Sequence, residues 1–303
     1  MNKGVHSVRR MCRLLKISRA TVHRRENYIV PESKIFKTKV INAIMQIWLD
    51  SKKRYGAPKI RHLLKIQYNF VVTIKTVSNY MREIKIQSVR FKKFKPNKTN
   101  KDKITRKNLL HKCKITTVNT HVLTDITYIY TPIDGWVYFL SFMDVVTRKI
   151  LKWSLSRRMD STFVDSLLIE LINDYPNIQM IHSDQGSQYT SKSYRDILKN
   201  NNIKSSYSRK GYPYHNAWIE SFHSSLKREQ IYTMVLVSIS DVESACFEYI
   251  DGFYNSTRIH ESLGYKTPNE FEKELLGSKI ITINTHKTNG FISYNGEIVE
   301  FAI

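Results

Sequence analysis

Three acidic residues occupy positions where carboxylates could do chemistry. Asp125 lies inside the strand-like run 122–130, Asp184 ends the strand-like run 178–184, and Glu220 follows in a helical segment. Carboxylate oxygens suit Mg²⁺ or Mn²⁺, and a pair of such ions is a common device for cutting and joining phosphodiesters. Each residue alone is more simply interpreted as a surface carboxylate or a sheet-end cap. The hypothesis therefore requires all three to act together, as catalytic residues and as ligands of two ions.

The composition excludes several classes of protein. Of the 303 residues, 41% are hydrophobic and 12% aromatic, which is enough for folded cores. No apolar run approaches the roughly 18–20 residues of a membrane helix, and the N-terminus lacks the apolar stretch of a signal peptide. Cys12, Cys113 and Cys246 are too widely spaced for a disulfide framework or a zinc site. We expect a cytoplasmic protein with no membrane partner.

The charge is unevenly distributed. Residues 1–114 contain 31 Lys and Arg against 5 Asp and Glu, a balance of +26, whereas residues 115–303 have a balance of −3. A basic module joined to a near-neutral one is typical of a nucleic-acid anchor attached to an enzyme. Solvated lysines on helix surfaces are the alternative, but an excess this large favours double-stranded DNA as a partner and an association with the nucleoid.

The basic part has two predicted helical units. Residues 1–30 predict a helix-turn-helix-like segment, because Ser7 and Ser18 can each cap a short helix. Residues 36–90 predict a DNA-binding helix-turn-helix domain, since apolar residues recur at helical spacing and Pro58 suits the first turn of a helix.

One helix of the second unit is a candidate for reading DNA. Residues 75–84 could form a recognition helix that exposes Lys75, Asn79 and Arg82. A plain three-helix bundle without groove contacts is the alternative. The following segment, 91–114, predicts an extended basic linker that tracks phosphates without reading bases, with Lys92, Lys93 and Lys95 among its DNA-binding residues.

Residues 115–275 predict a mixed α/β catalytic core. Three antiparallel strands are followed by alternating helix and strand and then by three helices. The strands are expected at 122–130, 137–143, 149–155, 178–182 and 203–207, and the helices at 162–172, 191–200, 216–231, 240–254 and 268–275. Residues 277–303 predict a small β tail with three strands, because Asn-Gly pairs at 289–290 and 295–296 favour hairpin turns.

Several short segments carry a family resemblance. They are Leu123–Tyr128, Gly135–Tyr138, Met143–Lys149, His182–Tyr189, Ser208–Gly211, Asn216–Phe222, Leu226–Lys227 and Tyr254–Asn255. In order and spacing they resemble the integrase/transposase catalytic core with the ribonuclease H fold. More narrowly, residues 5–275 look like the second-frame protein (OrfB) of the IS-three family of insertion sequences. This resemblance implies a DDE recombinase with Asp125, Asp184 and Glu220 in the three metal-ligand positions.

Other residues near these motifs have two interpretations each. Lys227 lies two helical turns from Glu220 and could hold a DNA strand, or it could be a solvated lysine. Arg209 and Lys210 precede Gly211 in a loop that could contact phosphates or simply be solvated.

A structural role is the simpler interpretation of five further residues. His182 could orient a ligand or be a packed, hydrogen-bonded histidine, and Asp144 is a strand-terminal carboxylate for which a structural role is favoured. Asn255, Arg258 and His260 are expected to brace the C-terminal helices, and contact with DNA is their less favoured alternative.

The sequence thus predicts a DNA transposase that cleaves the 3′ ends of an insertion sequence and joins them to target DNA. The resemblance implies a homo-oligomer on paired DNA ends and a first-frame partner, OrfA, that is separate or fused. Two alternatives stay open: a ribonuclease H-type nuclease that only hydrolyses, and a non-catalytic DNA-binding regulator.

Overall fold

The computed structural model describes residues 7–27, 29–89, 108–110, 115, 117–208, 216–277, 283–284, 290–294 and 297–301. The chain forms two compact units, Met1–Ser88 and Val89–Ile303, and each is described by itself. Among the described helices, none combines the length and the apolar character that crossing a membrane requires.

The first unit begins with two short helices, α1 (Val8–Leu14) and α2 (Arg19–Glu26). The Ser7 side chain accepts a hydrogen bond from the backbone N–H of Arg10, and the Ser18 side chain accepts one from Thr21. The two predicted caps are confirmed, because each serine satisfies a backbone donor that the first turn leaves free.

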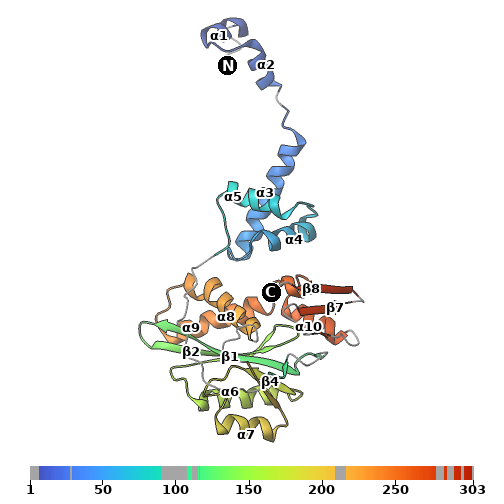
Figure 1. Cartoon of the computed structure of the whole chain (residues 1–303). Helices are drawn as coiled ribbons and strands as arrows, with labels where there is room; N and C mark the ends of the chain where they lie inside the picture. Colours follow the sequence, from blue (N-terminus) through green and yellow to red (C-terminus); the bar gives the residue numbers. More distant parts are fainter. Residues whose placement is uncertain are drawn as a thin grey trace. The chain divides into compact units, whose positions relative to one another are not determined.

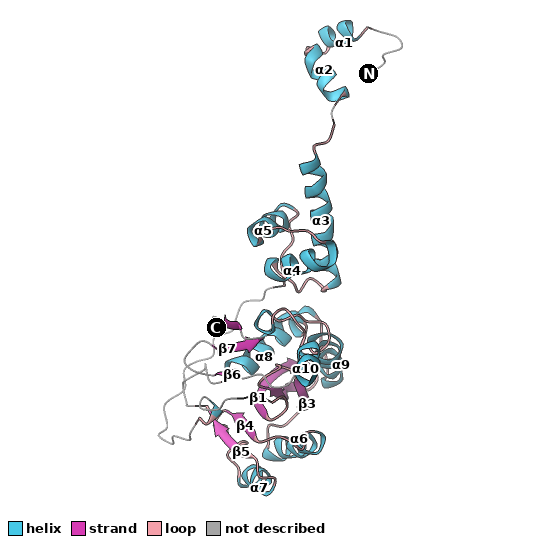
Figure 2. Cartoon of the chain, turned by 90° about the vertical axis from the view of Figure 1, so that its right-hand side faces the viewer, coloured by secondary structure: helices cyan, strands magenta, loops and turns pink. Residues whose placement is uncertain are grey.

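Three longer helices follow: α3 (Glu32–Asp50), α4 (Ala57–Tyr68) and α5 (Ile74–Glu83) (Figure 2). Pro58 lies in the first turn of α4, as predicted. The three helices share an apolar core to which Ile44, Leu64 and Val77 each contribute a fully buried side chain.

The second unit is built on a five-stranded mixed sheet of β1 (His121–Thr131), β2 (Gly135–Asp144), β3 (Ile150–Ser156), β4 (Met180–Ser183) and β5 (Lys204–Tyr207). The strand order is β3-β2-β1-β4-β5. The first three strands are antiparallel, while β4 and β5 run parallel to β1. This sheet confirms the predicted mixed α/β, ribonuclease H-like core. The turn between β1 and β2 contains Gly135 at φ 69°, a backbone conformation that glycine adopts without strain.

Helices cover both faces of the sheet (Figure 1). On one face lie α6 (Ser161–Asp174) and α7 (Lys192–Asn200), and on the other lie α8 (Ala217–Glu229), α9 (Ile239–Tyr249) and α10 (Pro268–Gly277). Short helical segments follow α8 at Ile231–Thr233 and precede α10 at Glu261–Leu263. The sequence predicts one helix over 240–254, but α9 ends at Tyr249 and continues as the π-helical segment η4 (Ile250–Tyr254).

A separate three-stranded antiparallel sheet follows, with the order β6 (Ile283–Asn284), β7 (Gly290–Tyr294) and β8 (Glu297–Phe301). Each strand pairs with the next one along the chain, so the predicted meander is confirmed.

One apolar stripe fixes α6 on the sheet. Val164, Leu167, Leu168 and Leu171 recur every three or four residues and pack into one core with sheet residues that include Val122, Leu140, Phe142 and Ile181. Adjacent to this stripe, Ile169 is 47% exposed. Leu168 and Ile169 are similar in size but lie on different faces of α6. Substituting each in turn therefore tests which face of the helix stabilises the unit.

Leu168→Ala is expected to destabilise the chain by about 2–5 kcal/mol, because it removes a fully buried side chain and leaves a cavity. Ile169→Ala, the matched control on the same helix, should change the free energy of unfolding by less than about 1 kcal/mol. Urea denaturation measures both. Equal losses for the two variants would contradict this packing of α6.

Candidate active site

The register of the central strands brings two of the three carboxylates together. In the parallel pair of β1 and β4, Val122 lies beside Ile181 and Leu123 beside His182. Continued by two residues, the same register places Asp125 beside Asp184, which directly follows the last residue of β4. Neighbouring strands lie about 4.8 Å apart, and laterally paired residues point to the same face. The strand order thus brings Asp125 and Asp184 near each other, close enough for the charge of Asp125 to raise the pKa of Asp184.

Glu220 is delivered by α8, which packs on that same face. The apolar side of α8 buries Ile219, Phe222 and Leu226, and the Phe222 ring lies 6.3 Å from the ring of Phe139 in β2. Glu220 lies in the first turn of α8, next to this apolar side. The helix thus holds its carboxylate at the end of the sheet where Asp125 and Asp184 lie.

The end of α8 is held in place by an ion pair. Arg258 donates from Nη2 to Oε1 of Glu229 at 2.8 Å and from Nε to Oε2 at 3.0 Å. The hydroxyl of Tyr249 donates to the same Glu229 carboxylate at 2.8 Å. Asn255 exchanges two hydrogen bonds with the backbone of Ile150 at the start of β3. Asn255 and Arg258 have the bracing contacts that the sequence predicts.

The three carboxylates influence one another electrostatically. Protein atoms around the Asp184 carboxylate limit its hydration and raise its pKa, and the nearby charge of Asp125 raises it further, against the hydrogen bond from Gly186. The pKa of Glu220 is raised by the same loss of hydration and then by the charges of Asp125 and Asp184. Both residues are nevertheless exposed at the surface. The three groups thus form a cluster of negative charge that a cation can reach.

The oxygen atoms of the three carboxylates are suitable ligands for divalent cations, but the three side chains are not close enough together to hold one. Within the described residues, no three His, Cys, Asp or Glu side chains lie close enough together to hold a metal ion. One Asp184 oxygen instead accepts the backbone N–H of Gly186 at 2.8 Å. All three groups supply the oxygen ligands that Mg²⁺ and Mn²⁺ prefer. Their assignment as catalytic metal ligands stays a prediction.

His223 contacts the site in a way that the sequence analysis does not foresee. Its Nδ1 lies 3.5 Å from Oδ2 of Asp125, and its Nε2 lies 2.8 Å from the hydroxyl of Ser141. Ser141 is the cross-strand partner of Asp125 in β2. His223 follows Glu220 by three residues, so one face of α8 carries both side chains to the sheet. That spacing is the only sequence signal for His223.

Gly186 leaves room for the Asp184 carboxylate. A Cβ at Gly186 would lie 3.0 Å from Oδ1 of Asp184 and 3.1 Å from Oε1 of Gln188. Both separations are tighter than nearly all real Cβ contacts, so a side chain at position 186 would require these two oxygens to shift by a few tenths of an ångström.

Lys227 lies beside the carboxylates, on α8. Its Nζ is 4.9 Å from the centre of the Tyr128 ring. Limited hydration lowers the pKa of Lys227, while the charge of Asp125 acts in the opposite direction. The lysine that the sequence singles out is therefore near Asp125, although its contact with DNA stays a prediction.

Two other candidate site residues, Asp144 and His182, have hydrogen-bonded surroundings that indicate a structural role. Asp144 is fully buried and accepts hydrogen bonds from the backbone N–H groups of Asn119 and Thr147 and from the Thr147 hydroxyl. His182 is also fully buried, with Nδ1 2.8 Å from the Ser206 hydroxyl and Nε2 3.0 Å from that of Ser208. Asp144 closes the turn after β2, and His182 joins β4 to β5.

The predicted recognition helix exposes the predicted residues. Lys75, Asn79 and Arg82 are exposed on α5, whereas Val77 and Met81 are buried. Nη1 of Arg82 donates to the Asn79 side chain at 3.3 Å. Five other predicted DNA-binding residues, Lys92, Lys93, Lys95, Arg209 and Lys210, lie outside the described residues.

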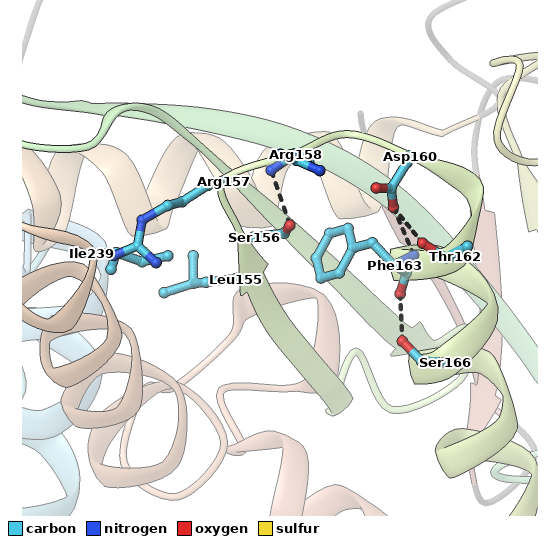
Figure 3. A pocket seen from close by; sticks show the side chains of 9 residues that line it. All are labelled: Leu155, Ser156, Arg157, Arg158, Asp160, Thr162, Phe163, Ser166 and Ile239. Carbon is cyan, nitrogen blue, oxygen red and sulfur yellow. Dashed lines mark hydrogen bonds between the residues drawn. The ribbon is translucent and has the colours of Figure 1, made fainter.

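The second unit contains a cavity, shown with its lining side chains in Figure 3. Its lining includes Arg157 and Arg158 after β3, Asp160 and Phe163 at the start of α6, and Ile239 at the start of α9. None of the three acidic residues lines it.

The family models agree with this architecture. An integrase core domain matches residues 116–213, a second integrase core model matches residues 201–268, and an HTH-like domain matches residues 36–94. A mixed sheet covered on both faces, with acidic residues at its centre and a helical unit before it, defines an integrase-type DNA transposase, which is a polynucleotidyl transferase.

Curated relatives narrow this class. The transposase for insertion sequence element IS904 of Lactococcus lactis is 36% identical over 256 residues, which are 83% of this chain and 99% of the relative. Transposase InsF for insertion sequence IS3A of Escherichia coli is 31% identical over 277 residues, 89% of this chain and 95% of the relative. The chain belongs to the IS3 family of insertion-sequence transposases.

Among solved structures, the chain is similar to the HTLV-2 integrase catalytic core domain in complex with magnesium, with a TM-score of 0.41 and 14% identity over 51% of this chain and 96% of that one. It is also similar to a simian T-cell lymphotropic virus intasome, with a TM-score of 0.44 and 15% identity over 76% and 74% of the two chains.

Asp184→Asn is expected to raise the thermal midpoint of the metal-free chain at neutral pH. Because the folded state raises the pKa of Asp184 above its unfolded value, this group contributes its full stability at low pH and loses it as the pH rises through the raised pKa. Asparagine carries no charge and can still accept the Gly186 N–H. Melting curves measured in a chelator should show a gain in thermal midpoint over the wild type that shrinks as the pH falls toward about 4. A gain in thermal midpoint that grows on acidification would contradict the electrostatic account.

Gly186→Ala is expected to lower DNA joining by about 10- to 100-fold, as for residues that orient metal ligands, because the added methyl group displaces the Asp184 carboxylate. Gly252→Ala is the matched control, since nothing lies within 4 Å of a Cβ at Gly252. Joining rates and thermal midpoints are compared for both. Full activity of Gly186→Ala would show that the loop tolerates a side chain there.

Proposed function

We propose that the chain cleaves the 3′ ends of an insertion sequence and joins them to target DNA in a reaction that requires divalent metal ions. Asp125, Asp184 and Glu220 are the catalytic residues and would hold two Mg²⁺ or Mn²⁺ ions. The observation that carries this proposal is that two adjacent strands and one packed helix bring these three carboxylates near one another. The charge of Asp125 raises the pKa of Asp184, and the charges of both raise the pKa of Glu220.

The chemistry requires no nucleophile from the protein. In cleavage, water attacks the phosphorus, a new P–O bond forms, and the 3′ oxygen of the element leaves. In joining, that 3′-hydroxyl attacks a target phosphate, and the 3′ oxygen of the target strand leaves. One phosphodiester replaces another, so joining needs no separate energy source. Bound divalent ions supply the Lewis-acid stabilisation of the attacking and leaving oxygens.

The chain's own residues position these reactants. Asp125 is supported by His223, and Asp184 by the Gly186 N–H. Lys227, beside Asp125, would neutralise a phosphate of the bound strand. Lys75, Asn79 and Arg82 would contact DNA from α5, and the basic segment 91–114, with Lys92, Lys93 and Lys95, would follow the backbone, as would Arg209 and Lys210.

The proposal includes an assembly. Two element ends must react with one target, and each chain carries one set of three carboxylates, so we propose a homo-oligomer on double-stranded DNA. A first-frame OrfA partner or fusion would recognise the element ends, and the complex would act on the nucleoid in the cytoplasm.

Asp184→Asn is expected to reduce strand joining by more than about 100-fold, because even residues that only orient metal ligands contribute 10- to 100-fold. DNA binding should persist. Asp196→Asn, which changes an exposed carboxylate on α7, is the matched control and should join normally. The assay uses oligonucleotide element ends, target DNA and Mg²⁺ or Mn²⁺.

The same assay separates the alternatives. Cleavage by the wild-type chain without joining would favour a nuclease that only hydrolyses. Binding without either reaction would favour a regulator. Retained joining by Asp184→Asn would overturn the assignment of the catalytic residues.

A further inference from the structure

The β1–β2 hairpin carries three exposed aromatic side chains, Tyr128, Tyr130 and Trp136, here called the aromatic cluster. They are 48%, 60% and 52% exposed, respectively. The ring of Trp136 lies 5.1 Å from that of Tyr128 and 5.3 Å from that of Tyr130, and both pairs are edge-to-face. The rings form one contiguous surface, although each keeps about half of its area in contact with solvent.

The strand register explains why the rings share one face. Tyr128 and Tyr130 are two residues apart in β1, so they point to the same side of the sheet. Trp136 is the cross-strand partner of Tyr130 in β2. Large aromatic side chains are usually the ones that folding buries, so an exposed group of three indicates a surface that binds something.

The aromatic cluster adjoins the carboxylates. Tyr128 follows Asp125 by three residues in β1, a distance of about 10 Å along the strand. This odd spacing points the two side chains to opposite faces. However, β4 ends at Ser183, and among the described residues no strand pairs with the β4-facing edge of β1 beyond Leu123. A ligand at this edge of β1 can therefore contact side chains on both faces of the sheet.

Lys227 joins the two sites. Its Nζ lies 4.9 Å over the Tyr128 ring, and it lies seven residues after Glu220, on the same side of α8. Aromatic faces bind nucleobases by stacking, and a lysine beside them binds the phosphate that accompanies each base. A protein partner could also cover the exposed rings. Binding a protein would not, however, require a cation at the edge of β1 that faces the carboxylates.

We propose that the aromatic cluster binds unpaired nucleobases of the DNA strand whose reactive phosphate lies at Asp125, Asp184 and Glu220. This inference rests on the proposed function. A stacked strand advances about 3.4 Å per nucleotide, so 10 Å corresponds to about three nucleotides. Tyr130, level with its cross-strand partner Trp136, lies five residues from Asp125, about 17 Å along the strand, which corresponds to about five nucleotides. The cluster thus meets bases about three to five nucleotides from the reactive phosphate, and holding them unpaired separates the reactive strand from its complement.

The test measures whether the aromatic rings and a nucleobase contribute to DNA-binding affinity through contact with each other. Element-end duplexes with five unpaired nucleotides on the reactive strand are prepared with normal bases or with an abasic nucleotide at each of these positions. The full-length chain binds them in a chelator at fixed salt, so that no reaction occurs. Removal of the stacked base should weaken binding by the wild-type chain about 5- to 150-fold at one or more positions.

The double variant Tyr130→Ala/Trp136→Ala should bind the normal duplex about 5- to 150-fold more weakly and should no longer distinguish abasic DNA. Tyr130→Phe/Trp136→Phe keeps the rings and should behave as the wild type. Phe247→Ala removes another exposed ring, on α9 and 63% exposed, as a matched control, and should change neither affinity.

Two results would overturn the inference: wild-type binding that ignores the abasic nucleotide, or alanine variants that keep the wild-type sensitivity to it. A change in sedimentation of the DNA-free alanine variant, with its abasic sensitivity intact, would assign the cluster to contacts between copies of the chain instead. Joining by the wild-type chain with Mg²⁺ is measured separately. Wild-type joining together with a failed stacking test would reject the cluster as a base-binding site and leave the proposed function standing.

Discussion

Repulsion among three carboxylates is the constraint on which this site depends. Like charges at close range raise one another's pKa and oppose folding, so side chains of this kind stay together only where other interactions fix their backbone. Here the parallel pairing of β1 with β4, which ends at Leu123 and His182, brings Asp125 and Asp184 near each other, and the buried stripe of α8 holds Glu220. Strand pairing and apolar burial supply the free energy that holds the carboxylates together against this repulsion. Metal binding does not have to supply it.

The helix that carries Glu220 is correspondingly well anchored. Phe222 contacts Phe139 in β2 and Tyr254 in η4, with ring centres 6.3 and 4.8 Å apart, while Arg258 and Tyr249 hold Glu229 at the end of α8. His223 adds a polar connection from α8 to Asp125 and Ser141. A helix held at both ends and along its length can keep a carboxylate in position against repulsion, which agrees with the preorganisation that catalytic sites require.

Charge is divided between the parts of the chain. The first 114 residues have a balance of +26 and the rest −3, so nonspecific attraction to DNA resides in the N-terminal part. The core, by contrast, has a negative cluster that would repel phosphates without cations. This division agrees with the proposed function: a polycation would concentrate the chain on DNA, and the proposed divalent ions would reduce the negative charge of the carboxylates.

The sequence by itself determined most of the secondary-structure elements and singled out the three carboxylates of the proposed site. Alternating and helical periodicities, serine caps and glycine turns are local signals, and they predicted β1 to β5, α6 to α8 and the terminal meander to within a few residues. The break of α9 into a π-helical segment at Ile250 was not predictable, because residues 240–254 carry one continuous helical pattern.

Only the tertiary structure decided the neighbours. His223 lies 98 residues from Asp125 in the sequence, so its contact with that carboxylate arises from packing of α8 on the sheet. The contact of Lys227 with the Tyr128 ring has the same origin. Burial likewise decided that His182 and Asp144 are hydrogen-bonded within the core. Local patterns specify which residues a strand or helix carries, whereas strand order and helix packing specify which of them meet.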